Sequence, residues 1–549
     1  MWSELNGYHG NRRKRIFAAA FSFLFTAMQI TGYQISMYYG TTVHQSAFFQ
    51  RIGVLSGIQC VVLATTEFAI GSVLLYLLFT LLERVKSQEK KEYGGRLVGI
   101  WALTTVLLMG CWMLCFLAAY PGFYNYDAFS QTPQALYDTV RYSAHHPLLH
   151  TLFMGKIIAF GYHHGVDLND GIALHSMIQM IICAAAFAYI CCYLLKNSGR
   201  RWLYAAAFCY YGFFPLIPMF AISTTKDTIF SLLLQLTVIF LYDMCRDMSA
   251  FFASGRRVIR FAGTVLLMCL FRKNGIYVVV CLIPFMLLLY RKYCRQIFLL
   301  FGMTILIYTA VNRGLIRILD AEEASAAEML SVPMQQLARV YNDHGEEAFE
   351  EDELEMIYAV ISAERLRGYD PFLSDNIKNS LNFDIVRAHK SDYLLLWIKK
   401  GVQYPRTYVQ AFLDNTYQAW YPGTSIYNAP NAGKTFYFDT GMCAGGYRET
   451  KAPALLQFYQ KLATEVYYQK LPIIRLLFSI GAMLWAAIFT ITFAIYRKRR
   501  PLTAAMLPVL LYCMTVLLGP ISLVRYYLVL FYGFPVSIGY LLSGEDSNL

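Results

Sequence analysis

Runs of about 20 apolar residues recur along most of the chain and constrain its fold more than any other feature. Residues 98–119 and 172–195 are two such runs. A run of this length crosses a bilayer as one α-helix, because its backbone hydrogen bonds then stay inside the segment. The composition agrees, with 57% hydrophobic and 15% charged residues and a mean hydropathy of +0.41. The sequence therefore predicts an all-α polytopic membrane protein.

The net charge of +12 does not indicate nucleic-acid binding, because the basic residues lie in short clusters between the apolar runs. Such clusters favour the cytoplasmic side of a membrane and set the topology. The clusters at 12–15 and 497–500 place both termini in the cytoplasm. We expect about twelve spans. Their approximate bounds are 16–38, 58–82, 98–119, 172–195, 202–222, 228–242, 251–271, 276–290, 297–311, 473–496, 502–518 and 521–542.

The apolar run 148–160 is too short for a span. If it crossed, the basic residues Lys196, Arg200 and Arg201 would lie outside, against the usual charge bias. We therefore expect an interfacial or re-entrant helix.

The chain divides into four predicted regions. They are an N-terminal helix pair with a cytoplasmic linker (1–97), a transmembrane core with an external loop at 120–170 (98–312), an extracytoplasmic, mainly helical domain (313–472) and a C-terminal three-helix segment (473–549). The linker is basic, whereas the third region begins with an acidic helical pattern and ends in a segment rich in Gly, Asn, Tyr and Pro. The membrane regions therefore flank one polar domain.

Residues 120–156 place one acid, two adjacent histidines and several tyrosines at a membrane face. Asp127 is suited to act as a general base for a hydroxyl group, or else to cap a helix. His145 and His146 would bind a phosphate or an acceptor, or hydrogen-bond the loop. The nearest acidic neighbour of Asp127 is Asp138, so a divalent metal has weak support, no metal ligands are assigned and no cofactor is required.

Three cations occupy external turns, where the charge bias of membrane proteins disfavours them: Lys226, Arg272 and Lys273. At that level they would neutralise a phosphate, or else they reach the interface as ordinary basic side chains do. Arg525 lies a few residues into the last expected helix. It would join the phosphate site or tether a loop through an ion pair.

Two motifs resemble the GT-C superfamily of membrane glycosyltransferases, which includes protein O-mannosyltransferases and aminoarabinose transferases. They are YNYDAFSQ around Asp127 and HHPLLHT from His145, the second of which opens the interfacial helix. The chain is also similar to an uncharacterised bacterial GT-C-like group. The matching segments are STTKDT, FRKNGIY, SVPMQQLARV, the Trp420-Tyr421-Pro422 turn and RYYLVLFYG. Many relatives carry a paired acidic motif in this loop, whereas this chain has Asp127 alone, which puts metal dependence in doubt.

This resemblance implies transfer of a sugar from a polyprenyl-phosphate-linked donor to an envelope glycan, lipid or protein, with inversion and with Asp127 as the base. It assigns the donor phosphate to Lys226, Arg272, Lys273 and Arg525. The substrate-binding residues that we expect are Tyr126, Gln131, His145, His146 and Tyr526. The expected location is the plasma membrane of a bacterium, with the active site on the extracytoplasmic side.

Two other functions stay open at this point. A transporter or flippase of a lipid-linked saccharide would use the same cations to escort a phosphate headgroup, and Glu67 inside the second expected span fits such a role. A polymerase or ligase of envelope glycans would share the donor chemistry and differ in the acceptor. Discontinuous helices and structural repeats would favour the transporter, and the sequence shows no repeat.

Overall fold

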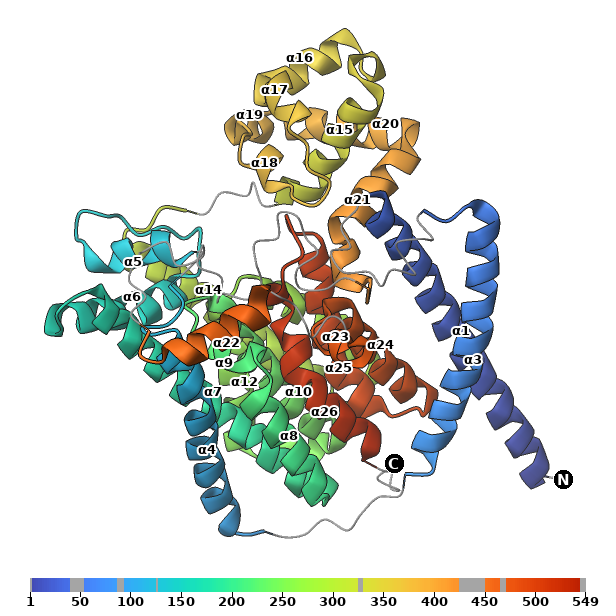
Figure 1. Ribbon diagram of the computed structural model, residues 1–549, viewed down its shortest axis with the longest axis vertical. Helices are drawn as coiled ribbons and strands as arrows, with labels where there is room; N and C mark the ends of the chain where they lie inside the picture. Colours follow the sequence, from blue (N-terminus) through green and yellow to red (C-terminus); the bar gives the residue numbers. More distant parts are fainter. Residues whose placement is uncertain are drawn as a thin grey trace.

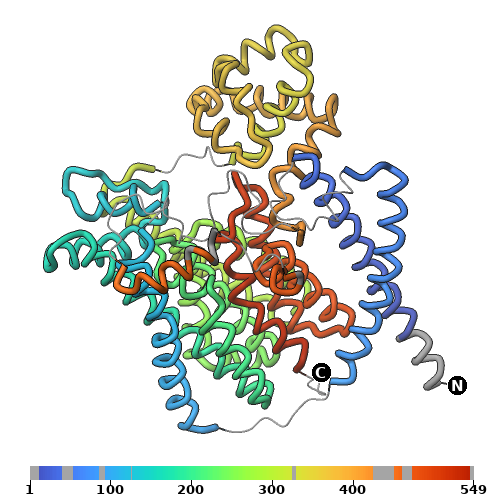
Figure 2. The backbone as a smooth tube through the Cα atoms, in the orientation of Figure 1, coloured from blue at the N-terminus to red at the C-terminus, as the bar shows by residue number. Residues whose placement is uncertain are grey.

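The computed structural model of the chain describes residues 2–39, 54–85, 93–124, 127–323, 329–423, 450–464 and 471–543 (Figures 1 and 2). Within these ranges the secondary structure is helical, and β-pairing is limited to isolated bridges. The predicted all-α class is therefore confirmed. Seven of the described helical segments are long and apolar enough to cross a membrane, so the count of about twelve spans stays a prediction.

Each of these seven segments corresponds to one of the expected spans. They are Asn11–Tyr38 within α1 (Trp2–Tyr38), α3 (Gly57–Glu83), α4 (Arg96–Ala118), α7 (Leu168–Ser198), α10 (Lys226–Arg246), the 3₁₀ turn η1 (Arg291–Tyr293) with α14 (Cys294–Ile318), and α25 (Arg500–Leu517). Several other expected spans are shorter or interrupted. The expected span 202–222 forms α8 (Arg201–Phe213) and α9 (Leu216–Ala221), because the chain turns at Phe214-Pro215, where proline lacks a backbone donor.

The remaining helices of the membrane part are short. They are α11 (Met248–Phe252), α12 (Gly255–Phe271), α13 (Asn274–Leu289), α23 (Pro472–Leu477), α24 (Ile480–Tyr496) and α26 (Leu528–Leu542). α10 lies at the centre of the bundle, where it packs against α12, α25 and α26 (Figure 1). By contrast, α1 and α3 lie side by side at the edge of the bundle, and α3 is largely exposed. α10 therefore begins in the middle of the molecule and not at the edge of the bundle.

The 120–170 loop region forms two helices, α5 (Ala128–Leu136) and α6 (Leu148–His164). α5 packs on α6, and α6 packs on α7. α6 has 17 residues, and its interfacial or re-entrant placement stays a prediction. It packs tightly on α7, because a Cβ atom at Gly171 would overlap the carbonyl group of Ile158. This contact fixes the segment that carries the two histidines.

A helical domain forms a separate lobe at one end of the bundle (Figure 1). Its elements are α15 (Ser331–His344), the turn η3 (Glu346–Ala348), α16 (Glu351–Val360), α17 (Ala363–Arg367), α18 (Asp375–Lys378), α19 (Phe383–Ala388), α20 (Lys390–Gln403) and α21 (Pro405–Trp420). Its core lies within residues 334–408. α22 (Pro453–Thr464) also lies in the predicted 313–472 region, but it packs against α4 of the bundle.

Arg339, which forms an ion pair with Asp414 inside this helical domain, also joins the domain to the bundle. The guanidinium group of Arg339 donates to the carboxylate of Asp414 at 2.9 Å and to the hydroxyl of Tyr39, at the end of α1, at 3.0 Å. The backbone N–H of Ser374 also donates to the carbonyl oxygen of Pro520 at 3.0 Å. The domain therefore rests on the segment that directly precedes Arg525.

Candidate functional site

Backbone pairing brings two distant loops together at the start of α10. The N–H of Phe123 donates to the carbonyl oxygen of Ile222 at 2.9 Å, and the N–H of Thr224 donates back to Phe123 at 3.0 Å. Gly122 has a φ of 124°, and a Cβ atom there would lie 2.9 Å from the carbonyl oxygen of Ile222, so glycine permits the close approach. This pairing fixes the segments that lead to Asp127 and to Lys226.

Asp127 directly precedes α5, yet its side chain makes no capping hydrogen bond to that helix. Its carboxylate instead forms an ion pair with the Lys226 ammonium group. The same carboxylate lies 3.7 Å from Nδ1 of His146 and 4.0 Å from Nη1 of Arg525. Lys226, His146 and Arg525 thus meet at the partly exposed carboxylate of Asp127.

The charges around Asp127 determine its protonation state. Burial alone raises the pKa of the carboxyl group, but the positive charges of Lys226 and Arg525 outweigh burial and hold that pKa well below its usual range. Burial and the Lys226 charge lower the pKa of His146 to about 3. The carboxylate is therefore ionised and the imidazole neutral at pH 7, with Nδ1 of His146 3.2 Å from the Lys226 ammonium group.

A second carboxylate, which the sequence analysis did not single out, lies next to the first. Asp227 occupies the first turn of α10, is fully buried, and accepts a hydrogen bond from the Thr225 hydroxyl at 2.9 Å. It forms an ion pair with Arg272, and Nε of Arg525 lies 3.9 Å from it. Its position beside Lys226 at the start of an apolar helix is the signal that could have revealed it.

Arg525 links the two carboxylates, but from a different element than expected. It lies in the 3₁₀ turn η5 (Val524–Tyr527), and α26 begins only at Leu528, so its placement inside the last helix was wrong. Tyr526, next to it, packs against two guanidinium groups. The Cζ atoms of Arg272 and Arg525 each lie 4.7 Å from the tyrosine ring centroid, and Arg525 donates to its hydroxyl oxygen at 2.8 Å.

The other residues predicted for the site lie in several different surroundings. Lys273 donates to the carbonyl oxygen of Ala144 at 2.6 Å, and the ring of His145 contacts that of His146 with centroids 4.7 Å apart. Gln131 is fully buried, and its amide donates to the Thr151 hydroxyl at 2.8 Å, within the contact between α5 and α6. Tyr126 lies outside the described residues.

We call Asp127, His146, Lys226, Asp227, Arg272, Lys273, Arg525 and Tyr526 the charged cluster. In the part of the chain that the structure describes, no three His, Cys, Asp or Glu side chains gather as metal ligands. The charged cluster can bind an anionic group and present an ionised carboxylate beside it. This combination suits proton abstraction next to a phosphate.

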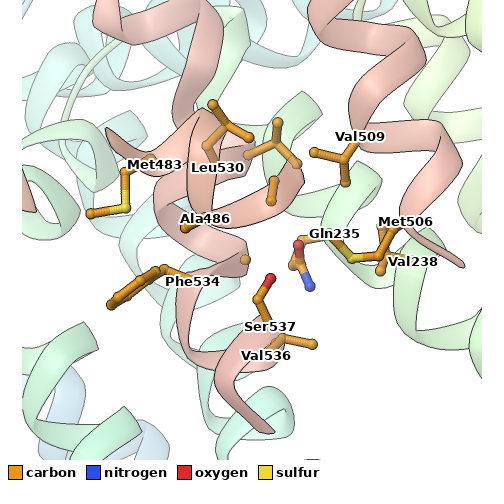
Figure 3. Close-up of a pocket in the computed structure, with 13 residues that line it drawn as sticks. Gln235, Val238, Met483, Ala486, Met506, Val509, Leu530, Phe534, Val536 and Ser537 are labelled. Atoms are coloured by element: carbon orange, nitrogen blue, oxygen red, sulfur yellow. The ribbon is translucent and has the colours of Figure 1, made fainter. Parts of the chain in front are cut away.

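A cavity of about 10 Å³ lies elsewhere, inside the bundle between α10, α24, α25 and α26 (Figure 3). Gln235 and Ser537 are the polar side chains among its mainly apolar lining. Its volume is enough for about one water molecule. This cavity is therefore too small to hold a sugar or a lipid headgroup.

Comparison with known proteins gives one family. Residues 137–542 match the model of a family of unknown function, DUF6020, and the chain belongs to this family because the match covers more than half of its length. The matched region contains every cation of the charged cluster and Asp227, whereas Asp127 precedes it. No curated protein and no solved structure matches the chain.

Proposed function

We propose that this DUF6020 protein is a membrane glycosyltransferase. It would transfer a sugar from a polyprenyl-phosphate-linked donor to an envelope acceptor, with inversion, on the extracytoplasmic face of a bacterial plasma membrane. The observation that carries the proposal is the contact of the ionised Asp127 carboxylate with Lys226 and Arg525. An acceptor base and a cationic phosphate site are then side by side, as the reaction requires.

In the proposed reaction, Asp127 takes the proton of an acceptor hydroxyl group. The acceptor oxygen attacks the anomeric carbon, and the bond between that carbon and the phosphate oxygen breaks, so the lipid phosphate leaves with one additional negative charge. Lys226, Arg272, Lys273 and Arg525 stabilise this developing charge. The reaction needs no oxidant or reductant, and its atoms and charges balance.

The ion pair with Lys226 makes Asp127 a weak base while the site is empty of donor, because a nearby cation stabilises the carboxylate. A donor phosphate competes for the same ammonium group. When Lys226 turns to the phosphate, the carboxylate regains basicity, so donor binding prepares the base for the acceptor. The helical domain would shape the acceptor site, since Ser374 contacts the segment preceding Arg525.

Transport of a lipid-linked saccharide is the second candidate. The interruption between α8 and α9 favours it, because discontinuous helices form the substrate sites of many transporters. A polymerase or ligase of envelope glycans falls within the first proposal and differs from it only in the acceptor.

The test uses the purified full-length protein in lipid vesicles with radiolabelled sugars on polyprenyl carriers and an envelope fraction as acceptor. We expect label to move to the acceptor with inverted anomeric configuration. Movement of intact donor lipid across the vesicle membrane without transfer would refute the glycosyltransferase and support the transporter.

A further inference from the structure

Helix α20 of the helical domain presents a row of aliphatic side chains on its outer side. They recur at helical spacing and are between 47% and 77% exposed: Leu394, Leu395, Ile398 and Val402. The opposite side of the helix faces the core of the domain, where Leu396 and Lys400 are buried. Large aliphatic side chains that gather on one exposed face mark a contact surface. We call the four exposed residues the aliphatic face of α20.

Buried polar contacts fix this orientation of α20. The Lys400 ammonium group donates to the carbonyl oxygen of Ala348 at 2.7 Å and pairs with the carboxylate of Glu353 at 2.5 Å. A rotation of α20 that buried its aliphatic face would break both contacts and leave the Glu353 carboxylate buried without this partner. The occupant of the aliphatic face therefore comes from outside the helical domain.

α20 lies close to the level at which α1 ends. The hydroxyl of Tyr39, directly after α1, donates to the carboxylate of Asp414 in α21 at 2.7 Å. Tyr408 precedes Asp414 in α21 by about 9 Å along the helix axis. The Tyr408 hydroxyl in turn donates to the carbonyl oxygen of Trp397, in the middle of α20, at 2.8 Å. A short stretch of α21 thus separates α20 from the end of α1.

This level corresponds to the surface of a bilayer. The segment Asn11–Tyr38 of α1 is long and apolar enough to span a membrane, so its end marks the boundary of the hydrocarbon core. The headgroup region beyond that boundary is about 5–8 Å thick on each side. Side chains that extend from α20 are therefore within reach of the headgroups.

The residues of α20 and its surroundings favour lipid over protein as the occupant. Lys390 begins α20 and Arg406 follows its end, and both side chains are exposed. Asp392, the acidic residue of α20, lies 3.5 Å from Nδ1 of His389. Helices that lie in a bilayer interface combine an apolar face with basic residues, because anionic headgroups attract them. Protein interfaces are instead enriched in aromatic residues and methionine, which the aliphatic face lacks.

We propose that the aliphatic face of α20 docks in the headgroup layer of the membrane, on the side where the helical domain lies. The occupant is lipid, and anionic headgroups are preferred. Docking gives the domain a further attachment besides α21 and the contact of Ser374 with Pro520, and so holds it at a constant height above the bilayer. The inference concerns the position of the domain and does not depend on glycosyl transfer.

The test places the photo-crosslinker p-benzoylphenylalanine at Leu395 of the full-length protein, in nanodiscs that contain phosphatidylglycerol. Illumination attaches its benzophenone group to a neighbouring C–H bond, and mass spectrometry then identifies the neighbour. The matched control carries the same group at the exposed Glu355 of α16, at the end of the domain farthest from the bundle (Figure 1). We expect about tenfold more lipid adduct at Leu395 than at Glu355, because only α20 reaches the headgroups.

A substitution tests the apolar character of the contact. Leu394→Asp changes an exposed position and should leave folding intact. With the photo-crosslinker at Val402, we expect this substitution to lower the lipid adduct about fivefold, because a carboxylate is unfavourable among acyl chains. Glu355→Gln is the matched control and should leave the adduct at Val402 unchanged.

Three results would overturn the proposal. Equal lipid adduct at Leu395 and Glu355 would show that contact with lipid is not specific to α20. A crosslink from Leu395 to a second copy of the chain would assign the aliphatic face to a dimer. Absence of any adduct at Leu395 would show that the face lies in solvent.

Discussion

Asp227→Asn removes the buried carboxylate between two arginines while keeping the size of the side chain. In the wild type, Asp227 is fully buried, pairs with Arg272 and lies 3.9 Å from Nε of Arg525. The variant leaves both guanidinium groups in place without this counter-charge. We therefore expect a loss of folding stability.

The burial of the ion pair determines the size of this loss in folding stability. Breaking a buried ion pair by removing one partner costs about 3–5 kcal/mol. We expect about 4 kcal/mol for Asp227→Asn, because two cations lose one carboxylate but Arg525 retains Asp127 at 4.0 Å. Arg272→Met should cost about 3 kcal/mol, and the double variant should cost about 2 kcal/mol less than the sum of both.

The free energy of unfolding is measured by SDS titration of the purified full-length protein in mixed micelles, with tryptophan fluorescence as the signal. Asp320→Asn is the matched control, because its carboxylate also pairs with an arginine but is 87% exposed. That control should change the stability by less than about 1 kcal/mol. A loss at Asp227 no larger than at Asp320, or strict additivity with Arg272→Met, would refute the reasoning.

Three further predictions concern other parts of the molecule. Gly32→Val should lower the melting temperature, with a loss of about 1–3 kcal/mol, because a Cβ atom there would lie 2.5 Å from the Tyr421 ring; an unchanged melting temperature would contradict this packing. Arg339→Met should leave the buried Asp414 unpaired and cost about 3–5 kcal/mol, which limited proteolysis between bundle and helical domain would detect as faster cleavage. The pKa of His146 lies near 3, below its unfolded value, so its contribution to stability is complete above about pH 6.5 and falls by about 2 kcal/mol at pH 5. His146→Gln should remove that acid dependence from thermal unfolding curves, and an unchanged slope would argue against it.

The long helices could be predicted from the sequence, because a run of apolar residues has one stable arrangement in a bilayer. α4 and α7 therefore begin and end close to the expected bounds. The break between α8 and α9 was missed, although Pro215 marks it, because the apolar run continues across it. Hydropathy reports burial in lipid and does not report where the backbone turns.

The site likewise contains residues that could be predicted from the sequence and residues that could not. Lys226 and Arg525 were singled out because cations at the external face of a membrane need a reason, and the structure brings both to Asp127. Asp227 was missed, because an acid in the first helical turn is ordinary and its pairing with Arg272 exists only in the folded chain. Gln131 was expected in the site, but its neighbours in space bury it.

The most direct test of the account compares wild type with Asp127→Asn in the transfer assay, in vesicles that contain equal amounts of folded protein. Asparagine keeps the shape of the side chain but cannot take the acceptor proton, so we expect transfer to fall by about 10²–10⁴-fold. Donor binding should persist, because Lys226 and Arg525 remain to hold the phosphate. Equal transfer by both proteins would contradict the assignment of Asp127 as the base.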